Sequence, residues 1–221
     1  MTETLNRKFE SARKPSGVSA AEIAITTLER HGVEVVFGVP GVHTLALYDR
    51  LSRSSIRHVL ARHEAGAGFM ADGYARATGR PGVAIIITGP GITNVATPVG
   101  EAFADSSPLM ILSSNVPRAH IDKMRGNLHD LKDQLGLMKA ITKWNARVES
   151  PDDVGSIISE GLRRSTSGRP RPVHVEIPLD VLDMRAHSVD QVEAPIDQDC
   201  SPSSDQVDEA VARLKRATQV I

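Results

Sequence analysis

Glu64 is the residue of this chain whose type and position best suit chemistry. It lies between an apolar segment, 56–61, expected to form a strand, and a helix expected from residue 64 to 77. A carboxylate at such a junction faces the carboxyl edge of a sheet, where open α/β folds bind their ligands. A first-turn acid favoured by the helix dipole explains this position about equally well. The expected buried face of the helix consists of Phe69, Met70, Ala71, Tyr74 and Ala75.

Two glycine-proline turns follow neighbouring apolar segments. Gly38–Gly41 comes after segment 33–37, and Gly89–Asn94 comes after segment 83–88. Glycine allows a backbone to bend sharply and to approach a ligand closely. Either turn alone is also explained as a connection between a strand and a helix. Neither turn contains the Gly-x-Gly-x-x-Gly fingerprint or a phosphate loop, so a nicotinamide or nucleoside triphosphate enzyme is disfavoured.

Alternating strand and helix patterns predict an α/β fold, a doubly wound parallel sheet with helices on both faces, over residues 16–185. In addition to the strands expected from the apolar segments already named, two further strands are expected. They are continuous apolar runs, which are typical of a sheet covered on both faces. They are 109–113 and 173–177. The remaining expected helices are 19–30, 93–104, 134–141 and 152–165.

Composition excludes several classes of protein. The 221 residues are 40% hydrophobic and carry a net charge of −1, without the basic, aromatic-rich patch of a nucleic-acid binder. The single cysteine, Cys200, allows no internal disulfide and no structural zinc site, which fits a reducing, cytoplasmic location. Residues 1–15 are expected to form a flexible tail, because they lack the apolar core of a signal peptide or membrane span.

The C-terminal region differs in character. Residues 186–204 contain Pro195 and Pro202 with few apolar residues, and are expected to form an interdomain linker. Residues 205–221 resume a helical pattern and end in Val220-Ile221, as at the start of a buried strand. We therefore expect the truncated start of a second α/β domain, within a longer polypeptide.

Taken together, the motifs resemble those of thiamine diphosphate enzymes of the acetolactate synthase and 2-oxoacid decarboxylase superfamily. The resemblance is to the N-terminal, pyrimidine-binding domain, and it covers most of residues 16–183. It rests on the motifs Val36–Gly41, Arg62–Glu64, Ala71–Arg76, Gly79–Gly82, Gly89–Asn94, Ala104–Ser106, Ile141–Trp144 and Gly168–Val173.

This resemblance implies roles for individual residues. Glu64 matches the glutamate that hydrogen-bonds N1′ of the cofactor's aminopyrimidine and promotes its imino tautomer. The resemblance therefore favours a catalytic role for Glu64 over a role that is limited to the helix dipole. His43 and His129 match segments in which some members carry substrate-facing histidines, and are candidate catalytic residues for proton transfer. The positions that line the pyrimidine, beside Glu64 itself, are Pro40, Gly41, Thr88, Pro90 and Asn94.

The resemblance also implies a reaction and an assembly. The expected activity is decarboxylation or carboligation of a 2-oxoacid, in a homodimer or tetramer with the active site at the subunit interface. No metal ligands are expected here, since Mg²⁺ and the diphosphate would be held by a C-terminal domain, and FAD binding is left open by these residues. This chain alone is therefore expected to be inactive.

Departures from the acetolactate synthase pattern keep alternatives open. Gly41–Thr44 and Leu128–Asp130 are closer to a branch that includes 5-guanidino-2-oxopentanoate decarboxylase and to benzaldehyde lyase-like carboligases. A noncatalytic or split-subunit module, paired with a separate diphosphate-binding chain, is the alternative from another class.

Overall fold

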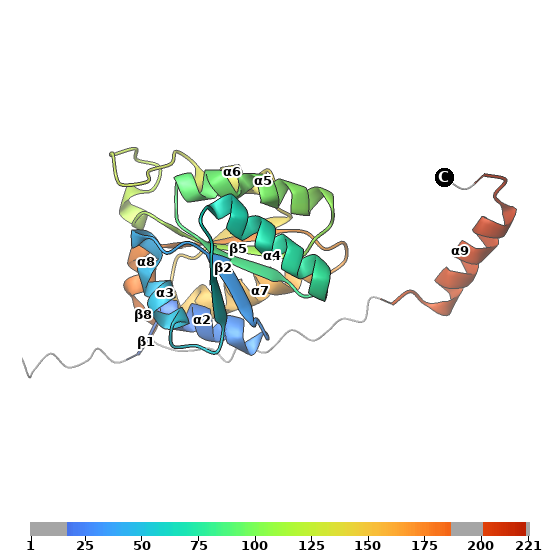
Figure 1. Cartoon of the computed structure of the whole chain (residues 1–221), viewed down its shortest axis with the longest axis horizontal. Coiled ribbons are helices and arrows are strands. Elements are labelled where there is room, and N and C mark those ends of the chain that lie inside the picture. The colour runs from blue at the N-terminus through green and yellow to red at the C-terminus, as the bar shows by residue number, and fades with distance from the viewer. Residues whose placement is uncertain (1–16, 187–200, 220–221) are drawn as a thin grey trace, which may run out of the picture.

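A six-stranded, fully parallel sheet forms the centre of the molecule in the computed structural model, which describes residues 17–186 and 201–219 (Figure 1). The strand order is β3-β2-β4-β5-β7-β6. The strands are β2 (Val35–Gly38), β3 (Arg57–Leu60), β4 (Gly82–Ile86), β5 (Leu109–Asn115), β6 (Trp144–Arg147) and β7 (Val173–Pro178). The doubly wound α/β fold predicted from the sequence is confirmed.

Helices cover both faces of this sheet, and each face has its own hydrophobic core (Figure 1). One core includes Leu28, Leu112 and Ile158, and the other includes Ile92 and Ile111. The helices over the first core are α2 (Ala20–Arg30), α3 (Leu45–Leu51), α7 (Val154–Thr166) and α8 (Leu179–Asp183). Those over the second core are α4 (Glu64–Thr78), α5 (Pro90–Ala104) and α6 (Gln134–Lys139).

The strand order reverses between β2 and β4. The chain leaves β2 to form β3 on one side of it, and then returns to form β4 on the other side. Gly38, at the carboxyl end of β2, is in register with Ile85 of β4. Open parallel sheets bind ligands outside the carboxyl ends of the strands at such a switch point. The two glycine-proline turns lie at that position.

Several elements differ from the sequence-based expectation. Helix α5 begins at Pro90 rather than at residue 93, because proline suits the first helical turn, where no backbone donor is needed. Strand β6 was not predicted, because its residues are only partly buried and form no continuous apolar run. Helices α3 and α8, and the pairing of β1 (Val18–Ser19) with β8 (Arg185–Ala186), were not predicted either. Three single-turn 3₁₀ helices complete the description, at Val42–Thr44, Arg118–His120 and Pro151–Asp153.

The expected buried face of α4 was partly wrong. Ala71 and Ala75 are buried as predicted, but Phe69 is 46% exposed. Helical periodicity cannot separate a residue that faces the core from one at the margin of the buried stripe. The small residues Ala67 and Gly68 are buried instead, since α4 packs closely on α5, and a Cβ at Gly68 would lie 2.5 Å from Cγ of Pro98.

The C-terminal helix is separate from these cores. Helix α9 (Ser204–Arg216) begins at the N-cap Ser203, and every one of its residues is exposed. The expected tail, most of the expected linker, Cys200 and Val220-Ile221 lie outside the described residues. No helix in the described ranges is long and apolar enough to cross a membrane.

A fully buried histidine makes the stability of this domain dependent on pH. Burial, and then the positive charge of Arg147, lower the pKa of His174 to about 3. As the pH falls from the ordinary histidine range toward 3, His174 binds a proton in the unfolded chain but not in the folded chain. This costs up to about 1.4 kcal/mol of stability per pH unit.

We expect His174→Gln to reduce this acid sensitivity. Urea unfolding at about pH 7.5 and about pH 5 should show a stability difference smaller by roughly 2 kcal/mol in the variant than in the wild type. Glutamine retains a partner for the Ser113 hydroxyl, which lies 2.8 Å from His174 Nε2. An unchanged difference between the two pH values would mean that another group controls the acid sensitivity.

Candidate functional site

Glu64 is the first residue of α4, at the carboxyl edge of the sheet, and its side chain is half-buried. Its Oε2 accepts a hydrogen bond from Nδ2 of Asn94, 2.9 Å away. Asn94 lies in the first turns of α5, so the pair joins the helix that follows β3 to the helix that follows β4. The structure thus brings together two of the residues that the sequence singled out.

Two glycines allow close packing beside this pair. A Cβ atom at Gly91 would lie 3.6 Å from Cγ of Glu64, and one at Gly41 would lie 2.3 Å from Cδ1 of Ile87. Gly41 therefore packs against the end of the segment that leads to Thr88. A side chain at either position would collide with Ile87, so glycine is needed for the two turns to pack beside the carboxylate.

The two prolines flank this surface. Pro40 is exposed in the turn after β2, and Pro90 is exposed as the first residue of α5. Thr88 is fully buried, so its side chain packs beneath the turn and is not exposed on this surface.

Tyr48 is a neighbour of Glu64 that sequence reasoning missed. Its hydroxyl donates a hydrogen bond to the backbone carbonyl of Ile85, 3.0 Å away. Burial raises the pKa of the Tyr48 phenol above its usual range, and the negative charge of Glu64 raises it further. Tyr48 is therefore a neutral donor beside a carboxylate. Tyr48 was not predicted because it belongs to α3, a short helix that was itself not predicted, and its partner Ile85 is distant in the sequence.

His43 and His129 lie next to each other at this edge. Their ring centroids are 5.7 Å apart, although they are far apart in the sequence. His43 is 6% exposed, and burial, followed by the proximity of His129, lowers its pKa. The neutral form of His43 is favoured, as suits a ring that accepts a proton.

His129 also contacts the second glycine turn. It has a positive φ of 63°, which is uncommon for a residue with a side chain, and its carbonyl oxygen would lie 2.3 Å from a Cβ at Gly89. The loop before α6 therefore packs directly against the turn before α5. All the predicted site residues belong to this one edge of the sheet.

Gln134 is the second residue of this site that was not predicted from the sequence. It is 1% exposed and bonds Thr88 and Gly89, 2.7 and 2.9 Å from its Oε1. From the sequence it was expected only as the start of a helix.

The arrangement fits an aminopyrimidine ring. Such a ring presents a nitrogen acceptor and an amino donor; a carboxyl group can share a proton with the ring nitrogen, and the Asn94 amide holds this carboxyl group in place. Gly91, at which a Cβ would lie 3.6 Å from Cγ of Glu64, lets the start of α5 approach the carboxylate closely. Among the described residues, no group of three or more His, Cys, Asp or Glu side chains is arranged to hold a metal ion.

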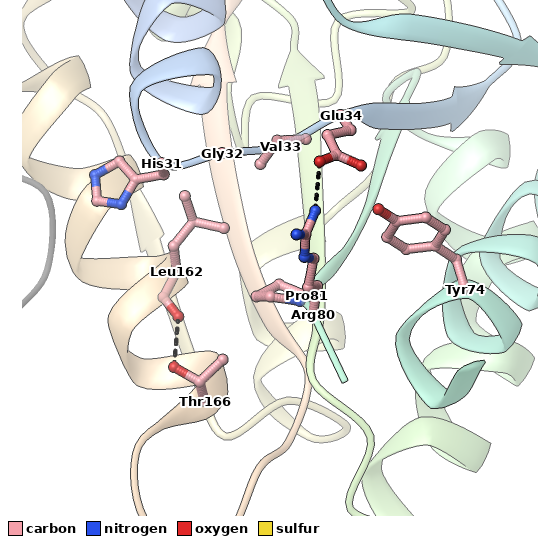
Figure 2. A pocket seen from close by; sticks show the side chains of 9 residues that line it. All are labelled: His31, Gly32, Val33, Glu34, Tyr74, Arg80, Pro81, Leu162 and Thr166. Carbon is pink, nitrogen blue, oxygen red and sulfur yellow. Dashed lines mark hydrogen bonds and ion pairs between the residues drawn. The ribbon is translucent and has the colours of Figure 1, made fainter. Parts of the chain in front are cut away.

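A separate cavity of about 400 Å³ lies at the opposite edge of the sheet (Figure 2). Val33 and Glu34 lead into the amino end of β2 there, and Arg80 and Pro81 lead into the amino end of β4. Arg80 is paired with Glu34 across its mouth. None of the predicted site residues lines this cavity.

The fold and the site define an α/β cofactor-binding domain with its carboxylate at a topological switch point. Residues 18–137 match the family described as thiamine pyrophosphate enzyme, N-terminal TPP binding domain. The chain belongs to this family, as its motifs predicted. TPP, thiamine pyrophosphate, is another name for thiamine diphosphate.

Curated relatives agree with this assignment. The chain is 52% identical over 165 residues to a probable 2-ketoarginine decarboxylase, AruI, of Pseudomonas aeruginosa, covering 75% of this chain and 30% of that protein. It is 41% identical over 166 residues to the mitochondrial acetolactate synthase catalytic subunit of Saccharomyces cerevisiae, covering 75% and 24%. A probable acetolactate synthase large subunit of Methanocaldococcus jannaschii is 41% identical over 167 residues, covering 75% and 28%. The chain thus spans less than a third of the length of these relatives.

Proposed function

We propose that this domain binds the pyrimidine of thiamine diphosphate in an enzyme that decarboxylates a 2-oxoacid, with or without carboligation to a second carbonyl compound. The observation that carries the proposal is the Asn94–Glu64 hydrogen bond at the switch point of the sheet. The named activities of the relatives, 2-ketoarginine decarboxylase and acetolactate synthase, support the same type of chemistry.

Each residue of the site then has a physical task. When bound, the cofactor supplies a nucleophilic carbon and an electron sink. Glu64 would share a proton with a ring nitrogen of the bound cofactor, and Asn94 would keep the carboxylate oriented. Gly41, Pro40 and Pro90 shape the surface beside the ring, and Thr88 supports the turn that leads to Pro90.

His43 and His129 are proposed to face the substrate. Two neighbouring imidazoles at the same edge as Glu64 are placed to move protons to or from a carbanion or alkoxide. The lowered pKa of His43 keeps one ring neutral and able to accept a proton.

A decarboxylase that acts on 5-guanidino-2-oxopentanoate, which is 2-ketoarginine, is the second candidate. It is favoured by the higher identity to the 2-ketoarginine decarboxylase, 52% against 41% for the acetolactate synthases mentioned above. Assay of the complete protein with a panel of 2-oxoacids, with product identification, separates the candidates. Release of carbon dioxide with an aldehyde product indicates decarboxylation, a hydroxyketone product indicates carboligation, and turnover of no 2-oxoacid contradicts the proposal.

Assembly around the site is part of the proposal. Large apolar side chains are exposed near this edge, including Val42 and Leu45 beside the first turn and Leu60 at the end of β3. A second subunit covering them would bring the Mg²⁺- and diphosphate-binding half of the site, which the family resemblance assigns to another domain. We propose a cytoplasmic homo-oligomer with this domain at residues 16–185, a linker at 186–204 and the start of a middle domain at 205–221.

The isolated chain should bind the cofactor weakly. Calorimetric titration of residues 1–221 with thiamine diphosphate and Mg²⁺ is expected to show no micromolar binding, because the diphosphate would contribute most of the affinity through a domain that is not part of this chain. Micromolar, Mg²⁺-dependent binding by the chain would contradict this expectation. The complete protein is the positive control.

A further inference from the structure

A connected group of polar side chains is buried on one face of the sheet, next to α6. Gln134 is 1% exposed, and His174 and Glu176 of β7 are fully buried. Burying polar groups costs free energy unless each finds a hydrogen-bond partner. A network in this position is therefore expected to have a task beyond packing.

Gln134 uses both ends of its amide within this network. Its Oε1 accepts hydrogen bonds from the Thr88 hydroxyl and from the Gly89 backbone amide. Its Nε2 donates to the Ser114 carbonyl at 2.9 Å and to Oε2 of Glu176 at 2.7 Å. Because the Gly89 amide can only donate and the Ser114 carbonyl can only accept, the orientation of the side-chain amide is fixed.

The other end of the network is anchored in the sheet. Glu176 lies in the middle of β7 and is paired with Arg147 of β6, whose side chain is 19% exposed. The ion pair keeps an acceptor in place for Nε2 of Gln134. Gln134 therefore links the β6–β7 side of the sheet to the turn that follows β4.

That turn has a backbone conformation that only glycine adopts readily. Gly89 has φ 65° and ψ −114°, and it is the N-cap of α5 without a side chain that can cap the helix. Because glycine also has the most flexible backbone, surrounding contacts are needed to hold this turn in one conformation. Gln134 supplies one contact from below, and the His129 loop packs against Gly89 as well.

We infer that Gln134 is a positioning residue that fixes the Thr88–Gly89 turn and, through it, the amino end of α5. The direction of α5 decides where Asn94 meets Glu64, because Asn94 lies one turn into that helix. The inference rests on the proposed function only in its consequence for cofactor binding. The linkage from Gln134 to Asn94 is a property of the domain itself.

Gln134→Met tests the linkage in residues 1–221 by NMR, without cofactor. The variant keeps the volume of the side chain and removes all its hydrogen bonds. We expect exchange of the Gly89 amide to accelerate about tenfold. We also expect the Nδ2 protons of Asn94 to move toward the chemical shifts of an exposed asparagine, because the bond to Glu64 weakens.

Two further variants separate positioning from general destabilisation. Thr142→Val also removes a buried hydroxyl near α6, one that donates to the Met138 carbonyl, and should leave the Asn94 signals unchanged. Gln134→Glu retains an acceptor for the Gly89 amide, and its second oxygen must share a proton with the Glu176 carboxylate that it meets. Its Asn94 signals should therefore return part of the way to those of the wild type. If both Gln134 variants fail to fold while Thr142→Val folds, the network is a folding requirement and the inference is overturned.

The remaining outcomes are distinct. Unchanged Asn94 signals in a folded Gln134→Met variant overturn the inference. In the complete enzyme, Gln134→Met should raise the dissociation constant for thiamine diphosphate about tenfold while the KM for the 2-oxoacid changes little. If the Asn94 signals shift but no form of the enzyme binds thiamine diphosphate, the proposed function fails and the positioning role stands.

Discussion

Replacing Glu64 with glutamine should slow exchange of the C2 proton of bound thiamine diphosphate by at least about 100-fold in the complete enzyme. Glutamine keeps the size of the side chain and can still accept the hydrogen bond from Asn94. It cannot share a proton with the ring nitrogen, so the tautomer needed for exchange is no longer favoured. Proton NMR of the cofactor after timed quenching in deuterated buffer measures the rate.

Glu22→Gln is the matched control. Glu22 is also an acid in the first turn of a helix, α2, and it pairs with Arg50 away from the site. If Glu64 served only the helix dipole, the two substitutions would have similar small effects on stability and neither would change exchange. Exchange at the wild-type rate in Glu64→Gln, with the cofactor bound, would remove Glu64 from the proposed mechanism.

The sequence was sufficient for those parts of the fold that depend on local pattern. Continuous apolar runs identified β4, β5 and β7 because both faces of these strands are buried. β6 was missed for the opposite reason, since Trp144–Arg147 is a partly buried edge strand. Phe69 was placed in the core because periodicity reports a face of a helix and not how far the neighbouring helix covers it.

In the site, too, residues with a local sequence signal were predicted, and contacts between distant segments were not. Glu64 was predicted from its strand-to-helix junction, and Asn94 entered only through the family resemblance, while their hydrogen bond required the structure. Gln134 was missed because its partners, Thr88 and Glu176, lie 46 and 42 residues away in the sequence. Contacts between distant segments leave no local signal, so residues that support a site from below are the hardest to predict.

Gly82→Ala should destabilise the domain by about 3 kcal/mol. Gly82 is the first residue of β4 and is buried where α4 crosses the sheet. A Cβ atom there would lie 2.0 Å from the backbone carbonyl oxygen of Ala71 and 2.6 Å from its carbonyl carbon. Backbone atoms cannot rotate away as a side chain does, so the collision can be relieved only by shifting α4 away from β4. The urea midpoint of the chain measures the loss.

Gly73→Ala, in the same helix, should have the opposite sign. No atom beyond its own helix and neighbours lies within 4 Å of a Cβ at Gly73, so alanine removes a flexible residue from a helix interior and should stabilise by about 0.5–1 kcal/mol. A Gly82→Ala midpoint equal to that of the wild type would show that α4 does not pack on β4 as closely as described. Because Glu64 begins α4, the displacement in Gly82→Ala should also move this carboxylate relative to Asn94. The Asn94 side-chain NMR signals should therefore shift in Gly82→Ala and remain in place in Gly73→Ala.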